Sequence, residues 1–441
     1  MSETPALRRE LGLRDTTLFA ITCIVGTRWI AAAAHAGPGS VTLWLMAAVF
    51  FVVPLARTVA TLMVKYPGAG GMYLWTRGEF GPWHGFLCGW VYWMSIAFWF
   101  PSASIFYMGA ALHALGLPQT RILLLAVSLA AIWTGLGTNL VGMKIGKWTE
   151  NVGGASAWLV SGLLVLLATL VWLRRGPATS LELAPTWDWQ TVSFWATIAY
   201  AMSGLELAGS MGAEIRDPER TFPRAAWMAS AAITAFYACA TLALLVLLRP
   251  EHVSELNGLA EAGDEAARVL RAGWLGPVMA VLVVASGLGQ IGGLGTGVSR
   301  LPFAAGKDGL LPAAFAKVHA RWGTPYVSIL ALGFVSTFLL AAIQLGDSLR
   351  AAYQELVSLM VITGFLPYLY IFGCAWRAGK RISALSGWAI TALAVLCAAI
   401  PTAQITNVAL FLAKLAAGTA AVIGSAWLVY RSRGNIIKVP S

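Results

Sequence analysis

The chain has 441 residues, of which 58% are hydrophobic and only 11% are charged, and its formal net charge is +11. Soluble globular domains carry about 25% charged residues, so this composition, with a mean hydropathy of +0.73, excludes an ordinary water-soluble protein. Apolar runs of about 20 residues recur along the chain, each long enough to cross a hydrocarbon core of roughly 30 Å. The sequence therefore predicts an all-α integral membrane protein.

Twelve apolar runs predict twelve membrane spans joined by short polar loops. In chain order we place them at 16–36, 40–64, 84–112, 121–141, 151–173, 191–212, 225–248, 274–299, 325–345, 351–374, 384–403 and 406–430. The first run leads directly into the second, which favours a retained helix over a cleaved signal peptide. The longest loop runs from Arg249 to Ala272 and leaves no room for a nucleotide-binding or catalytic domain. Any energy source must then be an ion gradient or an exchanged solute.

The basic residues are concentrated on one side of the predicted membrane. With the N-terminus inside, the cytoplasmic segments hold about 20 of the 30 Lys and Arg. This positive-inside bias predicts a multi-pass protein of the cell membrane with both termini in the cytoplasm. It also accounts for the net charge, so no nucleic-acid partner is predicted. The cytoplasmic basic residues are Arg8, Arg9, Arg14, Lys65, Arg77, Lys144, Lys147, Arg216, Arg220, Arg224, Arg300, Lys307, Lys317, Arg321, Arg377, Lys380, Arg381, Arg431, Arg433 and Lys438.

Two spans contain interruptions at matching depths. Span 1 contains Gly26-Thr27-Arg28, and span 6 contains Ser203-Gly204-Leu205-Glu206. Glycine-interrupted segments at corresponding positions in two halves are the best sequence pointer to a transporter's central site. An unwound turn frees backbone N–H groups that can bind a carboxylate and carbonyl groups that can bind an ammonium. The pair of breaks therefore suits a zwitterion, although glycine in a membrane helix also serves close packing.

Several motifs resemble those of one transporter family. The stretch Tyr66-Pro67-Gly68-Ala69-Gly70-Gly71-Met72-Tyr73-Leu74-Trp75, with Phe80-Gly81 after it, resembles the P-x-x-G-G-x-Y-x-W signature of amino acid–polyamine–organocation (APC) transporters. Four more stretches are similar to the family: Gly204-Leu205-Glu206, Glu214-Ile215-Arg216-Asp217-Pro218, Asp308-Gly309-Leu310-Leu311-Pro312 and Leu366-Pro367-Tyr368-Leu369-Tyr370. On these motifs the chain is identified as an APC-type amino acid permease or antiporter.

The resemblance implies the leucine-transporter fold with alternating access around a central site. Its parts would be a cytoplasmic N-terminus (1–15), a first repeat of spans 1–5 (16–173), an inverted second repeat of spans 6–10 (174–374), and peripheral spans 11–12 with the C-terminus (375–441). No cofactor is implied. Spans 11 and 12 allow dimerisation, as in some relatives.

The resemblance also implies a substrate site at the two breaks. Backbone amides of Gly26 and Thr27 would bind the substrate carboxylate. Carbonyls around Tyr200, Ala201 and Ser203 would bind its amine. The remaining expected site residues are Arg28 and Gly204 in the breaks, Tyr200 as a gating aromatic, Glu206 as a proton-sensing gate and Ser358 as a contact in span 10.

The chain departs from the family at the first break. Members commonly read G-S-G there, whereas this chain places Arg28 at the point of closest substrate approach. A buried intramembrane Arg costs at least about 2.5–3.5 kcal/mol and is rarely left unpaired. Three hypotheses follow: Arg28 binds an extra carboxylate of an acidic substrate, forms a structural pair with Glu206 or Glu355, or fills the carboxylate site and keeps the transporter closed.

Other polar residues receive plainer interpretations. Glu206 is either a proton-sensitive gate or a carboxyl bonded to the broken backbone, and Glu355 either lies at the outer interface or faces the pathway. Gly287-Leu288-Gly289-Gln290-Ile291-Gly292 fits a dinucleotide fingerprint, but it lies within an apolar span, which favours helix packing. Ser286, Thr296 and Ser299 could supply oxygens to sodium, yet their spacing singles out no site. The scattered histidines predict no metal cluster.

We therefore predict a secondary transporter of amino acids or close derivatives, an exchanger or a proton-linked carrier, with an acidic substrate if Arg28 contacts it. Proton-coupled relatives carry a Lys in span 5, and this chain has none from Asn151 to Trp172. The alternative is an amino-acid sensor that kept the fold without transport. We find no pairing of a nucleophile with a base in the sequence that would indicate an enzyme.

Overall fold

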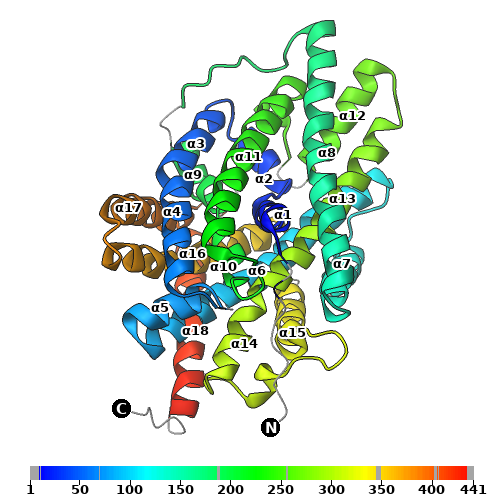
Figure 1. The fold of residues 1–441 in the computed structure, drawn as a ribbon. Coiled ribbons are helices and arrows are strands. Elements are labelled where there is room, and N and C mark those ends of the chain that lie inside the picture. The colour runs from blue at the N-terminus through cyan, green and yellow to red at the C-terminus, as the bar shows by residue number, and fades with distance from the viewer. Residues whose placement is uncertain are drawn as a thin grey trace.

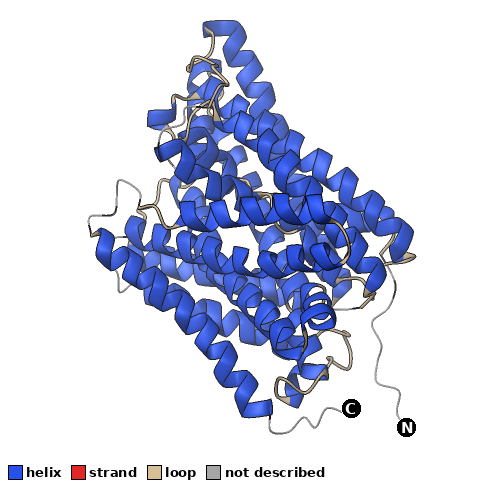
Figure 2. Cartoon of the chain, turned by 90° about the vertical axis from the view of Figure 1, so that its left-hand side faces the viewer, coloured by secondary structure: helices blue, strands red, loops and turns tan. Residues whose placement is uncertain are grey.

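The computed structural model describes residue 9 and residues 11–68, 70–185, 189–254, 257–343, 349–401, 405 and 407–434, and the described chain is helical almost throughout (Figure 1, Figure 2). Ala69 of the signature, Arg8 and Lys438 lie outside these residues. The helices up to predicted span 5 are α1 Leu13–Ile24, α2 Arg28–His35, α3 Ser40–Ala47, α4 Val53–Lys65, α5 Met72–Phe80, α6 Pro82–Ala114, α7 Arg121–Leu140 and α8 Met143–Arg175. The later helices are α9 Trp189–Ala201, α10 Leu205–Ser210, α11 Pro218–Leu247, α12 Gly258–Leu270, α13 Leu275–Val298, α14 Arg300–Lys307, α15 Tyr326–Ile343, α16 Leu349–Arg377, α17 Arg381–Ala398 and α18 Val408–Gly434.

The helices confirm an all-α membrane architecture. Nine helices in the described ranges are long and apolar enough to cross a membrane, and the bent pair α1–α2 makes ten. These match ten of the twelve predicted spans. Predicted span 6 is divided between α9 and α10, and predicted span 9 corresponds to the shorter apolar helix Tyr326–Ala342. The inverted repeat and the domain boundaries remain predictions.

Both predicted breaks are present and touch one another. The axes of α1 and α2 differ by 48° across the break. Gly204 before α10 has φ +123°, a conformation that residues with a Cβ rarely adopt. A Cβ at Gly204 would lie 3.2 Å from the carbonyl oxygen of Cys23, which shows how closely the second break approaches the end of α1. Glycine is therefore needed at this position for both its backbone angle and its size.

The glycine-rich run of α13 is a packing surface, as predicted. A Cβ at Gly287 would lie 2.2 Å from the Tyr107 ring of α6, and one at Gly289 would lie 2.4 Å from the Cα of Gly153 in α8. Such distances are impossible for real side chains, so glycine is required where these helices cross. The crossing of α8 and α13 brings the start of α8 next to α1, where Lys147 pairs with Asp15.

Two of the recognised motifs meet outside the spans. Tyr73 and Arg77 of α5, in the signature stretch, both donate hydrogen bonds to the carboxylate of Asp308, which follows α14. Burial, together with the hydrogen bond to Asp308, raises the pKa of the Tyr73 phenol. This phenol therefore stays protonated and acts as a donor. The contact ties the loop after span 2 to the loop after span 8.

Candidate functional site

A cavity of about 80 Å³ lies beside the first break. Four helices line it: α2, α9, α16 and the end of α17. Arg28 and Ser358, both predicted site residues, are in its wall. The lining residues are Arg28, Trp29, Ala32, Phe194, Ala196, Thr197, Tyr353, Gln354, Val357, Ser358, Val361, Cys397, Ala398 and Ile400. Because Cys397 and Ala398 belong to α17, predicted span 11 is not wholly peripheral.

Arg28 begins α2 and is 1% exposed. Its guanidinium donates to Ser102 Oγ at 2.7 Å and to the sulfur of Met360 at 3.5 Å. The guanidinium carbon lies 3.9 Å from the ring centroid of Trp29 and 5.2 Å from that of Trp99. Its Nε–H has no partner. The positive charge of Arg28 thus lies between two indole rings, and its hydrogen-bond partners are uncharged. Its Nε–H remains available as a donor.

The structural pair expected for Arg28 is not formed. Glu206 accepts hydrogen bonds from the Tyr92 hydroxyl and, at 3.1 Å, from the backbone N–H of Gly204. Glu355 accepts from Lys414 of α18 at 2.7 Å. Within the described ranges, no carboxylate lies in ion-pair distance of Arg28. The plainer interpretation of Glu206, a carboxyl bonded to the broken backbone, matches the observed contacts.

A tyrosine that sequence reasoning missed joins the two breaks. The Tyr237 hydroxyl of α11 accepts from the N–H of Gly26 at 2.9 Å and lies within hydrogen-bond distance of the carbonyl oxygens of Ile24 (2.9 Å) and Ala201 (3.3 Å). Freed backbone groups at membrane depth need such partners. A tyrosine in the middle of an apolar span was the available signal, since a buried phenol usually has a partner.

The other predicted residues surround this junction. Thr27 is fully buried between α1 and α2. Ser203 donates through its hydroxyl to the carbonyl of Tyr200 at 2.6 Å. The Tyr200 ring packs edge-on against Trp29, at 6.0 Å between centroids, and against Phe365 at 5.9 Å. Tyr200 therefore lies where an aromatic can restrict access to the breaks. Its gating role stays a prediction.

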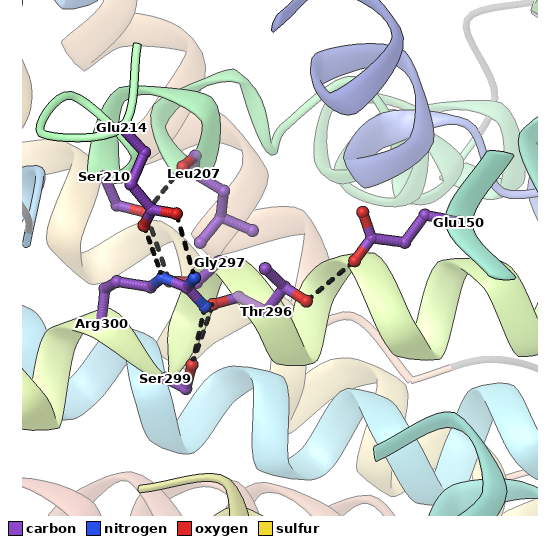
Figure 3. Close-up of polar contacts among 8 residues, drawn as sticks. All are labelled: Glu150, Leu207, Ser210, Glu214, Thr296, Gly297, Ser299 and Arg300. Carbon is purple, nitrogen blue, oxygen red and sulfur yellow. Dashed lines mark hydrogen bonds and ion pairs between the residues drawn. The ribbon is translucent and has the colours of Figure 1, made fainter. Parts of the chain in front are cut away.

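The predicted cytoplasmic side of the breaks is closed by a buried ion pair. Arg300 Nε lies 3.2 Å from Glu214 Oε1, and the two side chains are 4% and 5% exposed. Arg300 also donates to the carbonyl of Thr296 at 2.5 Å, and Ser210 donates to the carbonyl of Gly297 at 3.2 Å (Figure 3). These bonds fasten α10 and the segment after it to α13 and α14. Sequence reasoning did not predict that Glu214 and Arg300 form a pair.

An additional backbone contact lies next to this pair. Leu11 and Ile215 form an isolated parallel bridge, in which Leu11 N–H donates to Glu214 O at 3.0 Å and Arg216 N–H donates to Leu11 O at 2.8 Å. The residues before α1 are thereby attached to the segment after α10. In the described residues, no group of three His, Cys, Asp or Glu side chains is arranged to hold a metal ion.

Comparison with known protein families identifies the family of this chain. The family model described as amino acid permease matches residues 11–429. The chain therefore belongs to the amino acid permease family, within the APC transporters, and is a multi-pass membrane protein. The relatives are named as transporters, so the sensor alternative is not favoured.

Three relatives illustrate the range of the family. An uncharacterised transporter of Legionella pneumophila is 25% identical over 83% of this chain and 81% of its own length. A probable agmatine/putrescine antiporter of Lactococcus lactis is 22% identical, over 83% of this chain and 79% of its own. A serine/threonine exchanger of Bacillus subtilis is 26% identical, over 74% and 75%.

Proposed function

We propose that this protein is a plasma-membrane exchanger of amino acids, or close derivatives, that carry an additional carboxylate. Membership of the permease family supports transport of a small amino-acid-like solute. The Lactococcus and Bacillus relatives are named as an antiporter and an exchanger, which supports exchange as the mode. The acidic substrate is the further step, and it depends on Arg28.

The observation that carries the proposal is a buried guanidinium in the cavity wall without a carboxylate partner. Burying an uncompensated charge costs several kcal/mol, so the Arg28 site favours an anion supplied from outside the protein. None of the described residues that line the cavity is Asp or Glu. A substrate with an added cation would therefore meet Arg28 with nothing to balance its own charge. An added carboxylate removes the imbalance.

The breaks would bind the zwitterionic part of the same molecule. Carbonyl oxygens have two lone pairs, so those of Ile24 and Ala201 can accept from an ammonium besides the Tyr237 hydroxyl. The N–H groups of Thr27 and Arg28 are the donors proposed for the α-carboxylate, because those of Trp29 and Ile30 already donate to the carbonyls of Gly26 and Thr27. This pose keeps Thr27, Ala201 and Ser203 as backbone contacts, while the N–H of Gly26 stays bonded to the Tyr237 hydroxyl. Arg28 then reaches the second carboxylate.

The closed side of the site supports alternating access. The cavity lies beside α2, whereas the Glu214–Arg300 pair holds α10 against α13 and α14 on the predicted cytoplasmic side. Opening toward the cytoplasm requires these contacts to separate. Substrate binding between the breaks would lower the barrier to closing one side before the other opens.

The test is counterflow in proteoliposomes loaded with unlabelled amino acid, with external labelled glutamate, aspartate, alanine, leucine or arginine. A charged hydrogen bond contributes about 1.5–3 kcal/mol, so Arg28→Gln should lower acidic exchange about 10- to 150-fold and spare any neutral exchange. The matched control is Arg57→Gln, since Arg57 is an exposed intramembrane Arg of α4 outside the cavity.

The outcomes separate the two remaining hypotheses for Arg28, which are recognition of an added carboxylate and blocking of the carboxylate site. Loss of acidic exchange in Arg28→Gln alone supports the proposal. Preference of the wild type for a neutral or cationic amino acid would refute the acidic substrate. Inactivity of the wild type together with activity of Arg28→Gln would identify Arg28 as a plug.

A further inference from the structure

The turn between α16 and α17 carries basic side chains that the transport mechanism does not use. α16 ends at Arg377 and α17 begins at Arg381, and the two helices lie side by side (Figure 1). The turn is tight, because Gly379 adopts φ +76° and the N–H of Lys380 donates to the carbonyl of Ala375 at 2.9 Å. Three cations are therefore close together at the predicted cytoplasmic end of both helices, and none of them is in the wall of the substrate cavity.

The described part of the protein does not balance these charges. From residue 356 onward the sequence contains no Asp or Glu. Arg377 donates to the backbone carbonyl of Glu79, at the end of α5, and the Glu79 carboxylate is already in an ion pair with a lysine of α4. Lys380 and Arg381 are exposed, and in the described ranges neither has a carboxylate within ion-pair distance. Both cations are thus available to an anion from outside the protein.

Aromatic and apolar side chains adjoin these two cations. The guanidinium carbon of Arg381 lies 5.4 Å from the ring centroid of Trp376, which stacks on Trp388 with 5.7 Å between centroids. Arg381, Leu385 and Trp388 follow the spacing i, i+4 and i+7, so they share one face of α17. Leu385 is exposed, and Ile382, beside Arg381, is 84% exposed. The surface therefore changes from cationic to apolar within about one turn of the start of α17.

The membrane supplies a molecule that matches this surface. The helix Arg381–Ala398 is long and apolar enough to cross a membrane, so its exposed apolar side chains face lipid acyl chains. Clusters of Lys and Arg immediately cytoplasmic of a membrane helix attract anionic headgroups, and Trp rings lie at the headgroup level. A soluble anion would contact the two cations but would leave Ile382 and Leu385 uncovered. An anionic phospholipid contacts the charged and the apolar parts together.

We propose that the turn between α16 and α17 binds an anionic phospholipid of the cytoplasmic leaflet. Lys380 and Arg381 bind the phosphate through charge-assisted hydrogen bonds. Trp376 contacts the headgroup region, and Ile382 and Leu385 contact the acyl chains. The lipid lies against both helices, so it stabilises their packing. This site is separate from the substrate cavity, which the opposite end of α17 lines, and its test requires no substrate.

The test is thermal unfolding of the purified full-length protein without amino acid, in neutral detergent micelles titrated with phosphatidylglycerol or with phosphatidylcholine of the same acyl chains. A ligand that binds the folded state raises Tm, so phosphatidylglycerol should raise Tm more than phosphatidylcholine does. Each basic residue near a lipid surface contributes about fivefold in affinity. The double variant Lys380→Gln, Arg381→Gln should therefore raise the half-maximal concentration of phosphatidylglycerol about 30-fold. Because both side chains are exposed, its Tm without added lipid should equal that of wild type.

The matched control is Arg321→Gln. Arg321 is also exposed, and its guanidinium carbon also lies near an indole, 5.9 Å from the ring centroid of Trp322, but it belongs to the loop between α14 and α15. This variant should keep the wild-type response to phosphatidylglycerol. Glycerol phosphate, which has the phosphate but no acyl chains, should not compete with the lipid.

Four results would overturn the proposal. The first is an equal rise in wild-type Tm with phosphatidylglycerol and phosphatidylcholine. The second is an unchanged half-maximal concentration in the double variant. The third is full competition by glycerol phosphate, which would show a site for a soluble anion. The fourth is a change of oligomeric state in the double variant, measured by light scattering, with an unaltered response to phosphatidylglycerol; the turn would then be a contact between two copies of the chain.

Discussion

The Glu214–Arg300 pair predicts how far the conformational equilibrium can be moved by one substitution. Both side chains are almost fully buried, at 5% and 4% exposure. Removing one partner of a buried pair costs about 3–5 kcal/mol, because the remaining charge is left uncompensated. Opening the cytoplasmic side would expose Arg300 to water and relieve this cost. Glu214→Gln should therefore favour the open state about 100-fold or more, since 1.4 kcal/mol is about tenfold.

The assay is the distance between spin labels at Arg220 and Lys317, two exposed residues on segments that flank the pair. Glu214→Gln should populate a longer distance than the unsubstituted labelled protein. Adding Arg300→Gln removes the unpaired cation and should restore part of the short-distance population. The control is Glu219→Gln, an exposed carboxylate on α11. An unchanged distance distribution in Glu214→Gln would refute the reasoning that this pair holds the cytoplasmic side closed.

Three further predictions follow from single contacts. Tyr237→Phe removes the hydroxyl that joins the breaks, so exchange should fall about 5- to 150-fold, from about 1–3 kcal/mol for an unsatisfied buried group; unchanged exchange would contradict the bridge. Gly204→Ala forces a Cβ into φ +123°, which should lower stability by about 1–3 kcal/mol, measured as Tm, whereas an unaltered Tm would show that the turn relaxes. Because the pKa of Tyr73 is raised above 10.0, its contribution to stability is present below that pH and declines as pH rises past it. Tyr73→Phe should flatten the alkaline fall in Tm, and a fall of equal slope would exclude this phenol as its cause.

The sequence was sufficient for features that depend on local chemistry. Apolar run lengths placed the spans, because only a helix satisfies its own backbone within lipid. Glycines placed both breaks, since Gly204 adopts a positive φ that other residues avoid. Arg28 was recognised because an intramembrane charge is rare and costly. The structure places it in the wall of the cavity.

The sequence did not predict which side chains contact one another across the helix bundle. Glu355 pairs with Lys414, 59 residues further along the chain, rather than with Arg28. Ser102 of α6 and Met360 of α16 contact Arg28. Neither residue type on its own indicates that it binds a guanidinium. These contacts depend on how helices pack across the bundle. The same holds for α17, whose end lines the cavity although span 11 was expected to be peripheral.

Recognition of a second carboxylate by Arg28 can be tested by comparing glutamate with glutamine, because the two substrates differ at that one group. The measurement is the ratio of their exchange rates in proteoliposomes for wild type, Arg28→Gln and Arg57→Gln. We expect wild type and Arg57→Gln to prefer glutamate, and Arg28→Gln to lose this preference by about 10- to 150-fold. An equal glutamate-to-glutamine ratio in all three proteins would contradict it.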